Sequence, residues 1–242
     1  MISLVDLTLP TPAENLALDE ALLDDCDTGS GGQTLRFWEP TEVFVVVGYG
    51  NSVAQEVEMD ACVSAGIPVL RRCTGGGTVV QMPGVLNYNL VLQIPETGPL
   101  STLTGTNQFI MGRLREAIAS CPGLGERLSV RGVSDLCFDE RKVMGSAQRR
   151  KRTALVFHGS LLLGANLNLI ERFLRFPSKQ PDYRANRTHL EFCTNLGVPA
   201  SEIRNRMTQV WGSSPRLANI PWDRVNQLVR DRYGRSEWNH RS

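Results

Sequence analysis

Hydrophobic positions in the first third of the chain follow a helical period and then a strand period. Thr11-Pro12-Ala13-Glu14 has the pattern of a helix start, a capping box with proline at the first helical position. Apolar residues then recur on one broad face from Leu16 to Leu23, which predicts a helix ending near Asp25. Two β-rich segments follow at 35–38 and 43–48, and a helix is expected over 56–65, with Gly66 as its C-cap.

The later pattern places several strands in clusters between helices. Strands are expected over 67–72, 78–81 and 87–93, and again over 134–138, 142–148 and 154–163. Helices are expected over 103–120, 168–174, 201–211 and 222–232, followed by a polar, frayed tail at 234–242. Because there is no regular βαβ alternation, the pattern predicts an α+β fold with a mixed, largely antiparallel sheet flanked by helices.

Composition limits the class of protein. The chain has 242 residues, of which 41% are hydrophobic and 21% charged, so it can bury a sizeable core in a single domain over 1–233. The formal net charge of +1 gives no overall field for nucleic acid or an anionic membrane, and neither partner is expected. The longest apolar run, 43–47, is far too short to span a bilayer, and the N-terminus has no signal-peptide pattern.

The six cysteines are scattered along the chain. None forms a C-x-x-C pair, and the three histidines are far apart, so neither a zinc site nor a disulfide framework is predicted. Dispersed thiols fit a reducing compartment, and we expect a cytoplasmic, soluble protein. Cys73 and Cys137 lie beside the motifs described below, but the sequence shows no base or positive field that would make either thiol nucleophilic.

The most informative stretch is glycine-rich and runs from Arg71 to Gln81. An apolar segment leads into two arginines, then into Gly75-Gly76-Gly77, and then into another strand. Three consecutive glycines let backbone N–H groups approach an anionic ligand closely, and arginine donors suit phosphate or carboxylate. The alternative is a hairpin loop with surface arginines. The stretch matches neither the dinucleotide-binding fingerprint nor the P-loop, so pyrophosphate binding in those styles is not expected.

A second stretch contains one of only three lysines among 26 basic residues. Strict alternation over 142–148 would place Lys142, Met144, Ser146 and Gln148 on one face. Small residues at 145–147 suit a backbone that passes close to a ligand, and Lys142 could contact an acyl carbonyl or a phosphate oxygen. The alternative is an exposed strand with solvated charges, and 149–152 is expected to be a solvated turn. Asp135 could orient a ligand or could be a turn residue, and His158 is expected to be a hydrogen-bonded core residue.

Together these segments resemble the lipoate–protein ligase branch of the biotin/lipoyl ligase and octanoyltransferase superfamily. The resemblance covers roughly 14–196 and depends on the order and spacing of several short motifs. These are Asn15-Leu16-Ala17-Leu18-Asp19-Glu20-Ala21-Leu22-Leu23, Leu35-Arg36-Phe37-Trp38, the glycine-rich stretch, Leu86-Asn87-Tyr88-Asn89, Ser134-Asp135-Leu136, Arg141-Lys142-Val143-Met144-Gly145-Ser146-Ala147-Gln148 and His158-Gly159-Ser160-Leu161-Leu162.

The resemblance implies an ATP-dependent ligase with a biotin/lipoyl ligase catalytic fold. ATP and Mg²⁺ would activate lipoate to lipoyl-AMP, and the acyl group would pass to a lysine of a lipoyl domain or a glycine-cleavage H protein. The essential lysine of the family matches Lys142, and no metal ligand is carried over. The implied ATP and acyl-adenylate site comprises Arg72, Thr74, Gly75, Gly76, Gly77, Thr78, Val79, Val80, Asp135, Lys142, Gly145, Ser146 and Ala147.

Three departures from the family pattern leave alternatives open. Thr74 replaces a serine but keeps the hydroxyl, Gln81-Met82 stands where many ligases have His-Asp, and no accessory C-terminal domain is expected. Short relatives of this shape include two-component ligases that need a partner subunit and octanoyltransferases that act through a cysteine thioester, for which Cys137 is the candidate here. A non-catalytic subunit that binds lipoyl domains is a third class, disfavoured by the intact Arg72, Gly75–Gly77 and Lys142.

Overall fold

A seven-stranded sheet runs through the centre of the computed structural model, which describes residues 1–213, 217 and 219–241. Its strand order is β1-β2-β6-β10-β9-β8-β7, and every neighbouring pair except the parallel β1–β2 pair is antiparallel. The strands are β1 (Ile2–Asp6), β2 (Gln33–Trp38), β6 (Val85–Gln93), β7 (Leu128–Arg131), β8 (Asp135–Phe138), β9 (Arg141–Arg150) and β10 (Ala154–Leu162).

A smaller three-stranded sheet packs beside the large one. Its order is β4-β3-β5, with bounds β3 (Phe44–Val47), β4 (Val69–Arg71) and β5 (Val79–Gln81). β3 pairs in parallel with β4 and antiparallel with β5. The glycine-rich stretch is the connection between β4 and β5, so this sheet holds both ends of the loop.

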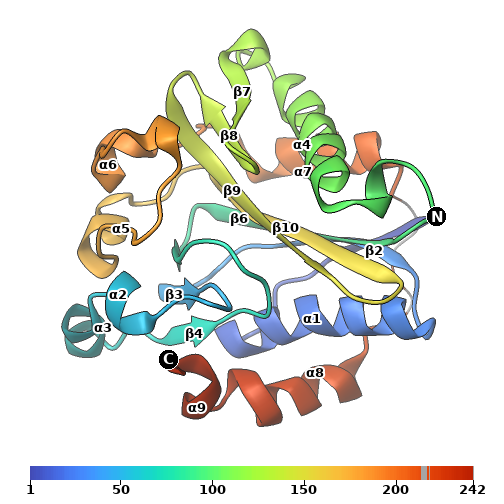
Figure 1. Cartoon of the computed structure of the whole chain (residues 1–242), viewed down its shortest axis with the longest axis horizontal. Coiled ribbons are helices and arrows are strands. Elements are labelled where there is room, and N and C mark those ends of the chain that lie inside the picture. Colours follow the sequence, from blue (N-terminus) through green and yellow to red (C-terminus); the bar gives the residue numbers. More distant parts are fainter. Residues whose placement is uncertain (214–216, 218, 242) are drawn as a thin grey trace.

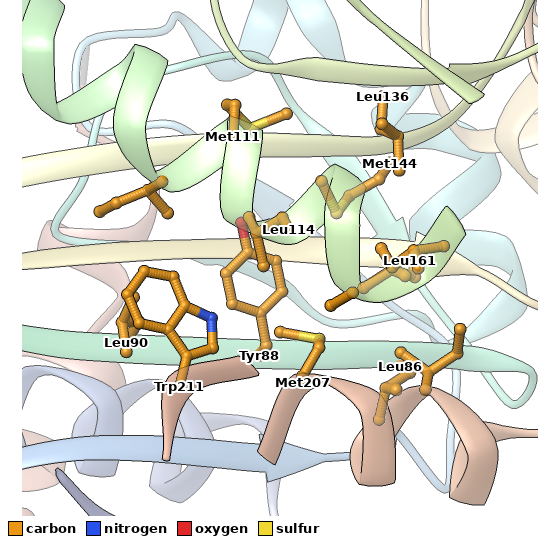
Figure 2. Packing of buried hydrophobic residues seen from close by; sticks show 14 of the residues in the cluster. Leu86, Tyr88, Leu90, Met111, Leu114, Leu136, Met144, Leu161, Met207 and Trp211 are labelled. Carbon is orange, nitrogen blue, oxygen red and sulfur yellow. The ribbon is translucent and has the colours of Figure 1, made fainter. Parts of the chain in front are cut away.

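Helices cover both faces of the large sheet (Figure 1). α4 (Leu103–Ala119) and α7 (Ala200–Trp211) lie on one face, where Leu114, Met207 and Trp211 pack on Tyr88 and its neighbours (Figure 2). α1 (Pro12–Thr28) and α8 (Trp222–Leu228) lie on the other face, with a π-helical turn, η4 (Val229–Tyr233), following α8. The capping box expected at Thr11 and Glu14 is present at the start of α1.

The remaining helical elements are short. They are α2 (Val53–Glu56), α3 (Met59–Ala65), α5 (Asn168–Phe173), α6 (His189–Phe192) and α9 (Ser236–Asn239), with the 3₁₀ turns η1 (Pro99–Ser101), η2 (Gly125–Arg127) and η3 (Asp182–Arg184). α2 and α3 pack with α5 against the small sheet in a separate apolar cluster. No helix among the described residues is both long enough and apolar enough to cross a membrane.

The predicted fold class, an α+β fold with a mixed and largely antiparallel sheet, is confirmed. One helix prediction was wrong in its bounds. The single helix expected over 56–65 is two helices, because Val57 leaves the helix to form an antiparallel bridge with Leu174. The helix expected over 222–232 is present, as α8 followed directly by the π-helical turn to Tyr233. Strands β1 and β7 and helix α6 were not predicted.

The expectation of a frayed C-terminal tail was also wrong. α9 packs at the end of β4, where the Asn239 side chain accepts a hydrogen bond of 3.0 Å from the Arg71 backbone N–H. The Trp238 indole donates a hydrogen bond of 2.9 Å to the Arg71 carbonyl. A polar composition alone does not show this packing, because the partners are more than 160 residues away in the sequence.

Candidate functional site

One cavity of about 390 Å³ lies between the glycine-rich loop, one face of the large sheet and the segment 170–193. The loop, the sheet and this segment all contribute residues to the cavity wall. Of the residues expected from the sequence, the wall contains Arg72, Gly76, Gly77, Thr78, Val79, Val80, Asp135, Lys142, Gly145, Ser146 and Ala147. Thr74 and Gly75 are the two expected residues that do not line it.

Arg72 shapes the glycine-rich loop from within. Its Nε donates to Thr74 Oγ1 at 2.9 Å, and its Nη2 donates to the carbonyls of Gly75 at 2.6 Å and Gly77 at 2.8 Å. Burial lowers the pKa of the guanidinium to about 10, so Arg72 still carries its charge at neutral pH. The loop also passes very close to β3, because a Cβ on Gly48 would lie 2.1 Å from the Gly76 carbonyl oxygen.

Arg71, the other arginine of the pair, faces away from the cavity. It is 1% exposed, and its Nη1 donates to the carbonyls of Gly48, Tyr49 and Asn51 at 2.9, 3.1 and 2.7 Å. Its Nη2 donates to the Arg241 carbonyl at 2.7 Å. The expectation of two ligand-binding arginines therefore holds for the position of Arg72 alone, and Arg71 joins the loop base to the C-terminal segment.

Lys142 reaches the cavity because a β-bulge interrupts the alternation of β9. Leu136 pairs with Met144, but Cys137 pairs with Lys142, so Val143 is the additional residue in β9. Val143 and Met144 both pack in the core beneath α4, and Lys142 is shifted to the opposite face. The predicted grouping of Lys142 with Met144, Ser146 and Gln148 was therefore wrong.

The Lys142 ammonium is held at the cavity wall by a carboxylate. Its Nζ lies 2.7 Å from Asp135 Oδ1, and the side chains are 28% and 15% exposed. Gly145 lies directly beneath, since a Cβ there would be 2.9 Å from Nζ. The other oxygen of the carboxylate, Asp135 Oδ2, accepts a hydrogen bond of 2.6 Å from the Tyr183 phenol.

Polar side chains from β5, β6 and β10 line one side of the cavity. Gln81, at the position where many ligases have histidine, exchanges hydrogen bonds of 2.9 Å with the Asn87 side chain and donates to Ser160 Oγ at 2.9 Å. His158 Nε2 lies 2.6 Å from Thr74 Oγ1. Burial, together with the nearby charge of Arg72, lowers the pKa of His158 to about 3, so the imidazole is neutral. The prediction of a hydrogen-bonded His158 is confirmed, although its ring also lines the cavity.

The cysteine beside the cavity is not the one chosen from the sequence. Cys137 is completely buried and does not line the wall, and Cys73 lies behind the loop, where burial raises the pKa of its thiol to about 12. Cys193 does line the wall, and its backbone forms an isolated parallel β-bridge with that of Lys142. Burial raises the pKa of the Cys193 thiol, while the charges of Lys142 and Arg184 act in the opposite direction.

The wall formed by 170–193 was not predicted from the sequence. This wall is rich in cations, because Arg175, Lys179 and Arg184 all line the cavity. Arg184 is 5% exposed, and its Nη2 has no hydrogen-bond partner among the described residues. Its only sequence signal is a density of basic residues in an irregular segment, which is also typical of a solvated loop. Among the described residues, no three His, Cys, Asp or Glu side chains are grouped as a metal site.

Comparisons with known proteins agree on the family. The family model described as the lipoyl protein ligase A/B catalytic domain matches residues 11–209. Octanoyltransferase LipM of Symbiobacterium thermophilum is 28% identical over 94% of this chain and 94% of its own length. Lipoate-protein ligase A subunit 1 of Thermoplasma acidophilum is 26% identical over 96% of this chain and 95% of its own.

Solved structures show the same fold. A bi-partite lipoate protein ligase from Thermoplasma acidophilum superposes with a TM-score of 0.82 at 22% identity, covering 99% of this chain and 97% of that one. A lipoate-protein ligase A solved with bound ATP has a TM-score of 0.76 at 23% identity, again covering 99% and 97%.

Proposed function

This chain belongs to the family of lipoyl protein ligase A/B catalytic domains, and from that premise we propose that it transfers an octanoyl group from a thioester donor to a protein lysine. The observation that carries the proposal is the pairing of Lys142 with Asp135 at 2.7 Å, on the wall of a cavity that the glycine-rich loop encloses. An ammonium held in that place can stabilise negative charge on an acyl carbonyl oxygen as a nucleophile attacks.

The cavity suits an acyl chain bound end-on. Leu16, Trp38, Val46 and Val79, which belong to one apolar cluster, line part of it, and Lys142 lines the same cavity. A chain bound along the apolar part would place its carbonyl near the ammonium, and its leaving group would lie toward Arg175 and Lys179. We expect the acceptor to be a lysine of a lipoyl domain or of a glycine-cleavage H-like protein.

A thioester donor is favoured by two observations. Octanoyltransferase LipM of Symbiobacterium thermophilum matches this chain over nearly its whole length. Cys193 lines the cavity, and its backbone forms an isolated parallel β-bridge with that of Lys142. In the first step, Cys193 Sγ attacks the donor carbonyl, the carbon–sulfur bond to the carrier breaks, and the carrier leaves as a thiol with the Cys193 proton. In the second step, the acceptor amine attacks the acyl-cysteine, forms an amide and returns a proton to Cys193.

A lipoate ligase that needs a partner subunit is the second candidate. It is favoured by the unpaired Nη2 of Arg184 beside Arg175 and Lys179, which are donors that fit a phosphate. The relative from Thermoplasma acidophilum named as a ligase subunit matches this chain equally fully. In this case ATP with Mg²⁺ would activate lipoate. Arg184 and Lys179 would then contact phosphate oxygens, and Lys142 would contact the acyl carbonyl.

One set of incubations separates these candidates. The purified chain is given an apo lipoyl domain with either octanoyl carrier protein, or lipoate with Mg-ATP, and acylation is followed by mass spectrometry. Transfer from the carrier protein without ATP, lost in Cys193→Ser and retained in Cys137→Ser, is the expected result. Acylation that requires ATP and is retained in Cys193→Ser would contradict the thioester donor and indicate an acyl-adenylate intermediate, as in the second candidate function. No acylation from either donor, with or without a candidate second subunit, would contradict both.

A further inference from the structure

Tyr183 touches the catalytic pair from outside the motifs that identify the family. Its phenol donates a hydrogen bond of 2.6 Å to Asp135 Oδ2, while Asp135 Oδ1 holds the Lys142 ammonium at 2.7 Å. The carboxylate is therefore held at both oxygens, by a donor from the η3 turn and by the lysine. A carboxylate that is held by one partner only can turn about its terminal side-chain torsion, which is broad.

The direction of the Tyr183 hydrogen bond is fixed. Burial and the neighbouring Asp135 carboxylate raise the pKa of Tyr183, so the phenol keeps its proton and acts as the donor. The Tyr183 side chain also lies next to Cys137, and its ring covers the turn before β8, because a Cβ on Gly132 would be 3.5 Å from Tyr183 Cε1.

The wall segment holds the Tyr183 ring in a defined place. The ring packs against Phe192 with 5.3 Å between centroids, and the Tyr183 carbonyl accepts a hydrogen bond of 2.9 Å from Arg187 Nη2. The backbone of Lys142 is fixed separately, because its carbonyl accepts a hydrogen bond of 2.9 Å from the Thr194 N–H. The free part of Lys142 is thus its side chain, and the polar contact that places its ammonium is Asp135.

We infer that Tyr183 is a positioning residue, which sets the place of the Lys142 ammonium by holding Asp135. Its effect on catalysis rests on the proposed acyl transfer. The contacts from Tyr183 to Asp135 and from Asp135 to Lys142 are present in the protein without substrate. Tyr183 also connects the cationic wall to the lysine, since it lies in the segment that forms this wall and its phenol contacts the Asp135 carboxylate.

The first test is a double-mutant cycle with Tyr183→Phe and Asp135→Asn, measured with the donor that supports acyl transfer. Removing a hydrogen bond to a charged group is expected to lower kcat about 10-fold in Tyr183→Phe, with KM for the donor near the wild-type value. Because Tyr183 acts through Asp135, the double variant should be no slower than Asp135→Asn alone. Tyr49→Phe, which removes a hydroxyl from an exposed side chain that does not line the cavity, is the matched control and should match the wild type.

The second test needs no activity. The chain has three lysines, so amine acetylation with a limiting reagent, read by peptide mass spectrometry, compares Lys142 with Lys151 and Lys179. Lys142 should be acetylated several-fold faster in Tyr183→Phe than in the wild type. The Asp135→Asn variant and the double variant should have the same Lys142 acetylation rate as each other. Lys151, which is paired with Asp24 at 2.5 Å, should be unchanged.

The two tests separate failure of the inference from failure of the function. A double variant slower than Asp135→Asn by the full factor that Tyr183→Phe loses, or Lys142 labelling that does not change in Tyr183→Phe, would overturn the role of Tyr183. If acyl transfer is absent with every donor but the labelling changes as expected, the proposed function fails and the positioning by Tyr183 stands. Thermal unfolding of each variant checks that the comparison is between folded proteins.

Discussion

Two adjacent arginines show how much a single position changes the role of one residue type. Arg71 donates to backbone carbonyls of 48, 49 and 51 and to the C-terminal segment, whereas Arg72 donates into its own loop and lines the cavity. Successive residues of a strand point to opposite sides, so the pair cannot serve one ligand together. Sequence proximity to the glycines made both arginines candidates. Arg71 is the last residue of β4, and Arg72 follows it with its N–H still paired to the Val47 carbonyl, so the two side chains point to opposite sides.

Replacing Lys142 by arginine keeps the charge but not the fit. The ammonium lies between Asp135 and the bare surface of Gly145, where a planar guanidinium is too wide. We expect Lys142→Arg to lower acyl transfer about 100-fold, the scale seen when a donor to a developing oxyanion is removed. The acylation rate of the acceptor domain measures this. Lys151→Arg, which keeps an ion pair with Asp24, is the control and should retain activity.

Gly145 keeps open the space that the lysine occupies. A methyl group there would lie 2.9 Å from Lys142 Nζ and 3.0 Å from its Cε, and the flexible side chain would have to move. We therefore expect Gly145→Ala to lower kcat while leaving the free energy of unfolding within about 1 kcal/mol of the wild type, because no backbone atom is displaced. Urea unfolding and acyl transfer are measured side by side. A normal kcat would show that the position of the ammonium is not critical.

At the scale of elements, one additional residue in β9 decides which side of the sheet carries the lysine. Inserting one alanine between Leu136 and Cys137 would give Val143 a partner in β8, restore simple pairing and return Lys142 to the face beneath α4. We expect this insertion to abolish acyl transfer and to move the lysine out of reach of Asp135. Val143→Ala keeps the bulge and serves as the control, expected to lose stability but to keep activity. An active insertion variant would contradict the assignment.

The C-terminal helix α9 stabilises the base of the glycine-rich loop. Trp238 donates to the Arg71 carbonyl, packs edge-on against Tyr233, and lies under the Arg241 guanidinium, 4.6 Å from its ring centre. We expect Trp238→Ala to lower the free energy of unfolding by about 3 kcal/mol, which is within the range for truncating a large aromatic residue. Urea unfolding measures the loss. A change below 1 kcal/mol would indicate that α9 is not an integral part of the domain.

At the scale of the whole molecule, burial of His158 couples stability to pH. Its native pKa of about 3 lies below the ordinary value near 6.5, so between these values the unfolded chain binds one more proton. The free energy of unfolding should therefore fall by about 2 kcal/mol from pH 7 to pH 5 through this residue. Urea unfolding of His158→Gln at both pH values should show a smaller fall than the wild type. An equal fall would assign the pH dependence to other groups.

The cavity lies where three apolar clusters meet. One cluster joins α4 and α7 to the large sheet, another joins α1 and α8 to its other face, and the third joins α2, α3 and α5 to the small sheet. The glycine-rich loop connects two strands of the small sheet, Lys142 lies in β9 of the large sheet, and the residues of the cationic wall come after α5 in the sequence. No single element could bring these groups together, so the site depends on how the two sheets pack.

Local pattern in the sequence was sufficient for the periodic elements and for the loop and lysine that identify the family. Apolar residues at helical spacing predicted α1 and α4 closely, and Gly76, Gly77 and Lys142, which come from the two predicted motifs, line the same cavity. These signals can be recognised without the structure because each depends on residues that are close together in the sequence. Thr74 illustrates the limit, since the sequence could not show that its hydroxyl is paired with Arg72 and His158 and that its side chain does not line the cavity.

The tertiary structure alone decided which side of each strand faces the cavity and which distant segments complete it. The bulge at Val143 reverses the face of Lys142, and strict alternation cannot anticipate an additional residue. Tyr183, Arg184 and Cys193 come from an irregular segment with no periodic signal, and α9 reaches Arg71 across the chain. Contacts between residues so far apart depend on the packing of both sheets and their helices, which no local pattern encodes.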